Sequence, residues 1–337
     1  MVHALPIQDW LALHFPVIDV RSPGEFQRGH IPGATNVPLF SNEERAVVGT
    51  IYKQQGRDPA MLEGLRIVGP KLANLVEMAH GVAREGRIRV HCWRGGERSG
   101  SVAWLLDKAG FAEVATLRQG YKGFRNHVLA GFVGPIELRV LGGYTGTGKT
   151  ETLKHLSDRG AQVLDLEALA HHKGSSFGGI GEAPQPTTEH FENLLWNAIR
   201  DLDKARPVWV EDESAMIGRV SLPRNLFGQM RAATLYFADM PVDQRIERLL
   251  EDYGGSPPEQ LAEALVRIAK RIGPQHCQRA LEALGHGDLR TVVSITLDYY
   301  DRSYRHGVSK RDPGRVVVLP AAADDLPGLA ERLIRLP

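Results

Sequence analysis

The sequence predicts an α/β protein of two domains, each built on a parallel β-sheet. Short apolar runs alternate along the chain with segments whose apolar residues recur at helical spacing, and strands that alternate with helices form parallel sheets. A chain of 337 residues is long enough for two hydrophobic cores. The turn-rich segment 131–135 separates two such series, so we expect domains at residues 1–133 and 134–337.

Three apolar runs and two helical patterns make up the first series. The apolar runs are short, as buried strands are, and the helical stretches carry apolar residues three and four positions apart. We expect strands at residues 16–20, 88–91 and 113–117, and helices at 72–83 and 102–106. Their alternation is the basis for a parallel sheet in the first domain.

The second series predicts another sheet and a helical C-terminal part. Strands are expected at residues 136–141, 163–164, 208–210, 234–237 and 316–319. Residues 259–304 are rich in helical patterns, with breaks at 273–274 and 285–287, and a final helix is expected to end at Arg335. Residues 174–186 are rich in Gly, Ser and Pro, which predicts a mobile loop.

Composition and charge place few limits on the binding partners. The chain has 41 basic and 40 acidic residues, a formal net charge of +1, which gives no global electrostatic case for nucleic acid. Cys92 and Cys277 lie far apart, which argues against a disulfide framework and for a reducing compartment. The chain starts without a signal-peptide pattern, and no apolar run approaches the ~20 residues of a membrane span. We therefore expect a soluble cytoplasmic protein without a membrane partner.

Cys92 is the candidate nucleophile, because it ends a predicted strand and opens a glycine-rich turn into a helix. Backbone N–H groups in such a turn, a helix N-terminus and nearby arginines all favour the thiolate. The residues expected to hold an anion around the thiolate, an oxyanion among the candidates, are Trp93, Arg94, Gly95, Gly96, Arg98 and Ser99.

Two families share this loop architecture. Residues 91–99, taken alone, fit the His-Cys, five residues, Arg-Ser pattern of cysteine phosphatases. The upstream segments 17–22, 25–26, 29–34 and 36–38 resemble the signature segments of rhodaneses, a fold that also houses some phosphatases. The fold expectation is therefore rhodanese-like, while the chemistry stays open. The loop is one residue longer than in simple sulfurtransferases, which suits an anion larger than a bare sulfur.

A second anion loop, Gly-Tyr-Thr-Gly-Thr-Gly-Lys-Thr, follows the first predicted strand of the second domain and precedes a helix, as in P-loop NTPases. Its glycines let backbone N–H groups reach phosphate oxygens, its lysine supplies a charge between phosphates, and its last threonine can bind Mg²⁺. The diphosphate-binding residues expected here are Gly143, Thr145, Gly146, Thr147, Gly148, Lys149 and Thr150. Glu211 and Asp212, at a strand end, are candidate Walker B ligands of Mg²⁺.

The order of a rhodanese-like domain and a P-loop domain resembles bacterial tRNA 2-selenouridine synthases along nearly the whole chain. The segments that carry the resemblance are 43–50, 52–56, 92–99, 119–122, 143–150, 165–167, 172–178, 191–195, 211–214 and 217–218. The resemblance implies an N-terminal rhodanese-like parallel-sheet domain, followed by a P-loop NTPase-like α/β domain with a helical C-terminal part.

The resemblance also implies a transferase with a two-step reaction on the wobble uridine of tRNA. Geranyl diphosphate would alkylate the sulfur of 2-thiouridine. Selenium from selenophosphate, with selenophosphate synthase as donor partner, would then replace the geranylated sulfur to give 2-selenouridine. Cys92 would carry selenium, and Mg²⁺ would accompany the diphosphate. We expect no organic cofactor, and no cluster of residues has the spacing of a structural metal site.

Other residues are weaker candidates. Tyr52, Lys53, His172 and Lys173 are possible contacts for tRNA or diphosphate. The apolar residues proposed to line a slot for the geranyl tail are Phe177, Phe191, Leu194, Leu195 and Trp196. The alternatives are a cysteine phosphatase or sulfurtransferase fused to a nucleotide-binding P-loop domain, and a regulatory protein whose rhodanese fold only senses a ligand. The last is disfavoured because both anion loops keep their chemical residues.

Overall fold

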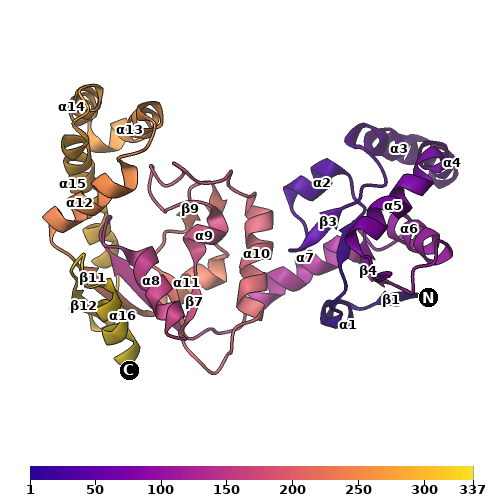
Figure 1. The fold of residues 1–337 in the computed structure, drawn as a ribbon, viewed down its shortest axis with the longest axis horizontal. Helices are drawn as coiled ribbons and strands as arrows, with labels where there is room; N and C mark the ends of the chain where they lie inside the picture. Colours follow the sequence, from indigo (N-terminus) through magenta and orange to yellow (C-terminus); the bar gives the residue numbers. More distant parts are fainter. Residues whose placement is uncertain (337) are drawn as a thin grey trace. The chain divides into compact units, whose positions relative to one another are not determined.

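The computed structural model describes residues 1–336, which form two compact units (Figure 1). The first unit consists of Met1–Gly131 together with Glu192–Asn197. The second consists of Phe132–Phe191 and the chain from Ala198 onward. Because six residues of one helix are counted with the first unit, the division is not a single cut in the sequence.

The first unit is built on a five-stranded parallel sheet in the order β1-β5-β4-β2-β3. Its strands are β1 (Val2–Leu5), β2 (Val17–Asp19), β3 (Ala34–Asn36), β4 (Arg87–His91) and β5 (Glu113–Leu117). The three strands predicted from the sequence correspond to β2, β4 and β5, whereas the edge strands β1 and β3 were not predicted. All five carboxyl ends meet at one edge of the sheet, which is where parallel sheets place their functional loops.

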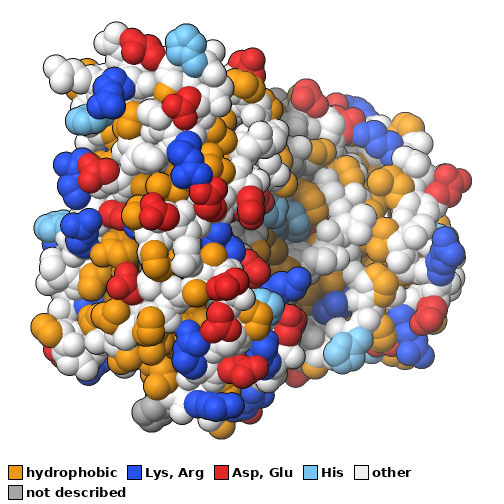
Figure 2. Space-filling model, turned by 60° about the vertical axis from the view of Figure 1, so that its left-hand side comes forward, with side chains coloured by type: hydrophobic (Ala, Val, Ile, Leu, Met, Phe, Trp, Pro, Cys, Tyr) orange, Lys and Arg blue, Asp and Glu red, His pale blue; other side chains and the backbone are white. Residues whose placement is uncertain are grey.

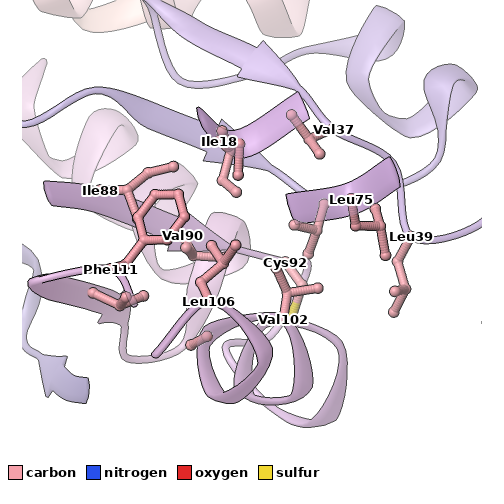
Figure 3. Packing of buried hydrophobic residues seen from close by; sticks show 14 of the residues in the cluster. Ile18, Val37, Leu39, Leu75, Ile88, Val90, Cys92, Val102, Leu106 and Phe111 are labelled. Carbon is pink, nitrogen blue, oxygen red and sulfur yellow. The ribbon is translucent and has the colours of Figure 1, made fainter. Parts of the chain in front are cut away.

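Seven α-helices accompany this sheet. They are α1 (Ile7–Ala12), α2 (Pro23–Arg28), α3 (Asn42–Gln55), α4 (Arg57–Val68), α5 (Leu72–Val82), α6 (Glu97–Lys108) and α7 (Gly120–Gly131), with a 3₁₀ turn, η1 (Gly69–Lys71), before α5. The predicted helices correspond to α5 and α6. Figure 3 shows Ile18 and Val90 of the sheet packed with Val102 and Leu106 of α6, and Cys92 lies in the same core. This packing fixes the end of β4 and the start of α6, and therefore the loop between them.

The second unit has its own five-stranded parallel sheet, in the order β12-β11-β6-β8-β7. Its strands are β6 (Leu138–Gly143), β7 (Gln162–Leu164), β8 (Val208–Glu211), β11 (Thr234–Asp239) and β12 (Val316–Pro320); β9 (Met216–Ile217) and β10 (Val220–Ser221) form a small antiparallel pair. All five predicted strands are present. The chain adds β7 and β8 on one side of β6 and β11 and β12 on the other, so the loop after β6 lies at a topological switch point, where such sheets bind ligands.

The helices of the second unit include the predicted C-terminal helical part. They are α8 (Lys149–Asp158), α9 (Leu166–Ala170), α10 (Thr188–Arg200), α11 (Arg224–Ala232), α12 (Val242–Tyr253), α13 (Pro258–Ile272), α14 (Pro274–Gly285), α15 (Leu289–Val308) and α16 (Leu326–Arg335), with a 3₁₀ turn, η2 (Pro313–Arg315). Helices α13, α14 and α15 enclose a core of their own, which includes Leu265, Ile268 and Val292. Figure 1 shows α13 and α14 lying away from the sheet of this unit.

The surface has no single dominant charge. Figure 2 shows Lys and Arg interspersed with Asp and Glu over the face in view, in keeping with the net charge of +1. Among the described residues, no helix is both long enough and apolar enough to cross a lipid bilayer.

Candidate active sites: a cysteine loop and a phosphate loop

Two glycines allow the cysteine loop to pack backbone against backbone. Gly95 has φ +67°, and a Cβ at this position would lie 2.3 Å from the carbonyl oxygen of Leu117. Gly120 has φ +54°, and its Cβ would lie 2.3 Å from the carbonyl oxygen of Cys92. Neither position therefore accepts a side chain. The N–H of Tyr121 also donates to the Cys92 carbonyl at 2.8 Å, which ties the loop to the start of α7.

The Cys92 thiol lies at the base of this loop and is only 3% exposed. Its Sγ is 3.2 Å from Oγ of Ser99, on the first turn of α6. Burial alone raises the pKa of the thiol. The hydrogen bonds from Ser99 and from the backbone N–H of Ser99 and Arg94, together with the Arg98 charge, outweigh burial and leave the pKa below its usual value. These interactions therefore make the thiolate easier to form than in an unperturbed cysteine.

We expect Ser99→Ala to make Cys92 less reactive at neutral pH. A hydrogen bond to an ionised sulfur is worth about 1.5 kcal/mol, so its loss should slow alkylation by iodoacetamide about tenfold below pH 8 and shift the pH profile upward. The measurement uses a Cys277→Ala background, in which Cys92 is the remaining thiol. A profile identical to that of the Ser99 protein would show that the hydroxyl does not stabilise the thiolate.

The two arginines of the loop have different surroundings. Arg98 donates to both carboxylate oxygens of Glu25, at 2.8 and 3.4 Å, whereas Arg94 is exposed. Trp93 lies against Tyr121, with ring centroids 5.8 Å apart. Glu25 therefore holds the Arg98 guanidinium near the buried sulfur. The Arg94 guanidinium belongs to the same loop but is exposed to solvent.

A buried ion pair lies beneath the cysteine loop, on the side of the sheet. The sequence analysis did not predict that these two residues support the loop. Asp19 and Arg21, in the rhodanese-like segment 17–22, pair at 2.6 Å and are almost fully buried. The Arg21 guanidinium lies 3.7 Å from the centroid of the Tyr121 ring. His91 is fully buried nearby, and burial lowers its pKa to about 4, so it is neutral at physiological pH. These groups hold the residues on either side of Cys92 in place.

The phosphate loop connects β6 to α8 in the second unit. Gly146 and Gly148 have φ of +85° and +70°, a conformation that side chains other than glycine rarely adopt. Lys149 Nζ bends back to the Gly143 carbonyl at 3.3 Å, and Thr150 Oγ1 donates to Glu167 at 2.9 Å. Lys149 and Thr150 are the first residues of α8, the positions from which a P-loop lysine reaches phosphates and a P-loop threonine binds Mg²⁺.

Helix α12 holds this loop through Arg245, which the sequence analysis did not single out. Arg245 donates to the Thr145 carbonyl at 3.2 Å and forms a double hydrogen bond with Asp301 of α15, at 2.9 and 2.7 Å. A Cβ at Gly146 would lie 2.9 Å from the carbonyl oxygen of Arg245. The helical C-terminal part therefore braces the phosphate loop.

A pocket of about 820 Å³ opens over the loop. Lys149, Thr150, His172 and Lys173 all line it, so the structure brings two of the weaker sequence candidates to the phosphate loop. Further basic residues at its walls are Arg231, Arg248 and Arg271. Acidic residues line the pocket as well, and Arg248 pairs with Glu151 and Lys173 with Glu182, so the lining is of mixed charge. The other two weak candidates, Tyr52 and Lys53, are exposed on α3 of the first unit.

The candidate Walker B residues have partners inside the protein. Glu211 is fully buried, accepts a hydrogen bond from the Leu166 N–H at 3.0 Å, and has a pKa raised well above its usual value by burial. Asp212 accepts from Arg311 at 2.5 Å and reaches the pocket wall. Glu167 and Glu213 also line the pocket, and burial together with the Glu167 charge raises the pKa of Glu213 to about 8. Sequence spacing alone did not single out these last two carboxyls.

The oxygen donors beside the loop fit Mg²⁺ bound together with phosphates. Thr150, Glu167 and Asp212 offer hydroxyl and carboxylate oxygens along one pocket. Within residues 1–336, no group of three or more His, Cys, Asp or Glu is arranged to hold a metal ion by itself. Mg²⁺ typically uses one or two protein oxygens plus substrate phosphates and water, so these two observations are compatible.

The fold and the two loops define a rhodanese-like domain followed by a P-loop domain. Comparison with known families agrees: the rhodanese-like domain family matches residues 6–127, and the tRNA 2-selenouridine synthase AAA domain matches residues 136–323. The chain belongs to the tRNA 2-selenouridine synthase family.

Curated relatives carry the same description. A tRNA 2-selenouridine synthase of Bdellovibrio bacteriovorus is 40% identical over 71% of this chain and 65% of its own length. One of Sulfurovum sp. is 34% identical over 90% of this chain and 91% of its own length. A crystal structure of the N-terminal domain of a putative ATP/GTP binding protein from Clostridium difficile is 40% identical, with a TM-score of 0.35 over 37% of this chain and 98% of its own.

Proposed function

We propose that this protein converts 2-thiouridine at the wobble position of tRNA into 2-selenouridine in two steps. The observation that supports the proposal is the presence, in one chain of this family, of a cysteine loop with a lowered thiol pKa and of a P-loop that opens into a large pocket. The first loop suits a selenium carrier and the second suits a diphosphate leaving group.

In the first step, the sulfur of 2-thiouridine attacks carbon 1 of geranyl diphosphate. A carbon–sulfur bond forms, the carbon–oxygen bond to diphosphate breaks, and the proton on N3 of the base is released. Lys149 neutralises the departing diphosphate, and the backbone N–H groups of residues 143–148 bind its oxygens. Bound Mg²⁺, held by Thr150 and a neighbouring carboxylate, would supply further charge neutralisation at the leaving group.

In the second step, selenium from selenophosphate replaces the geranylated sulfur, which leaves as geranylthiol. Alkylation in the first step makes this sulfur a better leaving group than a thiocarbonyl sulfur. The Cys92 thiolate attacks the selenium of selenophosphate: a sulfur–selenium bond forms, and the selenium–phosphorus bond breaks with its electron pair leaving on phosphorus as phosphite. The bound selenium then attacks carbon 2 of the base as geranylthiol leaves. A free thiol, which this step requires as reductant, cleaves the sulfur–selenium bond to give 2-selenouridine and a mixed disulfide on Cys92, which a second thiol reduces. Arg98 and the backbone donors of the loop hold the anion. Selenophosphate synthase would provide the donor.

The experiment that tests this proposal is mass analysis of nucleosides after incubation with thiolated tRNA, Mg²⁺ and a thiol reductant. Geranyl diphosphate alone should give geranylated 2-thiouridine, and the further addition of selenophosphate should give 2-selenouridine. Products that require ATP and ignore geranyl diphosphate would contradict the proposal. Rapid hydrolysis of a chromogenic phosphate ester would instead favour the cysteine phosphatase that residues 91–99 resemble.

A further inference from the structure

A narrow apolar branch leads away from the phosphate-loop pocket. We use this name for the space enclosed by Phe177, Leu249 of α12, Leu261 of α13, and Val293 and Leu297 of α15. The branch and the main pocket share five lining residues at their junction: Thr145, Ser175, Leu249, Tyr253 and Tyr300. Because Thr145 belongs to the phosphate loop, a ligand whose phosphates lie on that loop has its other end next to the branch.

The polar groups of the branch are already engaged within the protein. Thr296 Oγ1 donates back to carbonyl oxygens of its own helix, at Val292 and Val293, both at 3.0 Å. The Ser175 hydroxyl accepts from the N–H of Phe177 at 3.1 Å, and the Tyr300 hydroxyl accepts from the N–H of Ser176 at 3.1 Å. A ribose or a base in this branch would lose its water without gaining comparable partners, which is costly. A hydrocarbon has no polar groups that would lose hydrogen bonds to water, so its burial does not carry this cost.

The branch is also narrow. Its free volume is about 30 Å³, close to one water's share of the liquid. A ligand therefore enters only as the side chains that line the branch rotate, and a thin flexible chain requires the smallest displacement. Val293 and Leu297 are 6% and 2% exposed, so they form a closed wall rather than an open groove.

We infer that the apolar branch binds the hydrocarbon tail of a diphosphate ligand whose phosphates lie on the phosphate loop. This inference rests on the proposed function and adds to it the place of the isoprenoid chain. An apolar site for the tail beside the phosphate loop would favour an alkyl diphosphate over a nucleotide. Of the five residues that the sequence offered for such a slot, Phe177 lines the branch, whereas those on α10 are absent from its walls.

Two substitutions at Val293 test this inference: one fills the branch and the other widens it. Val293→Phe should raise KM for geranyl diphosphate at least about tenfold, because it displaces several methylene groups of the tail. Inhibition by inorganic pyrophosphate, which has no tail, should stay within about twofold of the unmodified protein. The matched control is Val266→Phe on α13, where the valine is 60% exposed; this variant should change neither value.

A smaller side chain should have the opposite effect. Val293→Ala should raise the use of farnesyl diphosphate relative to geranyl diphosphate about fivefold or more, because the wall recedes. This variant decides the question if Val293→Phe proves unfolded by circular dichroism. Unchanged kinetics in the folded variants, with an unmodified protein that geranylates tRNA, would overturn the branch alone. An unmodified protein that forms no geranylated product would overturn the proposed function together with the branch.

Discussion

Replacing Cys92 with alanine is expected to abolish 2-selenouridine formation while geranylation of thiolated tRNA continues. The cysteine loop is the selenium carrier in the proposed mechanism, and it belongs to a different unit from the phosphate loop. Alanine also fits the site, because the Cys92 side chain is packed in the core of the first unit and the loop backbone is held by glycine contacts. Nucleoside mass analysis should show geranylated 2-thiouridine accumulating in the presence of selenophosphate.

Two further variants provide a second test and a control for this experiment. Cys92→Ser should behave like Cys92→Ala, because a hydroxyl cannot form the selenium adduct. Cys277→Ala is the matched control: Cys277 is also buried, but it lies on α14, with its Sγ 3.6 Å from the Leu265 carbonyl oxygen. Selenouridine formed at the normal rate by the Cys92 variants would show that selenium passes directly from selenophosphate to the base.

The two anion loops were predictable because their signals are local. A strand, a glycine-rich turn and a helix follow one another within about a dozen residues in each case, and the glycines carry the backbone conformation that the turn needs. The positions of β4, β6 and α8 follow from the same local patterns. The family resemblance rested on these motifs, and the comparisons confirm it.

What the sequence could not predict depends on contacts between distant residues. Arg245 reaches both Thr145 and Asp301, and the Asp19–Arg21 pair supports Tyr121, which is a hundred residues further along the chain. No spacing rule connects such partners. The edge strands β1 and β3 contain no buried residue, whereas β2, which is as short as β3, is buried throughout, so β1 and β3 lack the apolar run that marked β2.

The same reasoning applies to the acidic residues. Asp212 follows a buried strand as a Walker B residue does, and the sequence favoured it on that ground. Its ion pair with Arg311, which is 99 residues away in the chain, is a tertiary contact. Glu167 acquires its place through the hydrogen bond from Thr150, and Glu213 acquires its raised pKa through burial beside Glu167. The sequence motifs therefore located one side of the phosphate-loop pocket through Asp212, but they did not identify Glu167 and Glu213 as further carboxyl groups that line it.

Lys149→Ala should stop geranylation and, with plain thiolated tRNA, selenation as well. Lys149 is the cation of the phosphate loop, and the loss of one group that stabilises developing charge typically lowers the rate on the order of 10²- to 10³-fold. The fold should survive, because Nζ contributes a 3.3 Å hydrogen bond to the Gly143 carbonyl and a cation–π contact 5.5 Å from the Tyr304 ring centroid, and neither lies in the hydrophobic core. Lys154→Ala, an exposed lysine on the same helix, is the matched control and should leave both products unchanged.

Supplying tRNA that is already geranylated should separate the two roles of the chain. The Lys149→Ala variant should then form 2-selenouridine at close to the normal rate, since the second step depends on Cys92 and selenophosphate and no longer on a diphosphate leaving group. Nucleoside mass analysis measures both products in one sample. If geranylated tRNA failed to restore selenation, Lys149 would be needed in both steps, and the assignment of one reaction to each loop would be wrong.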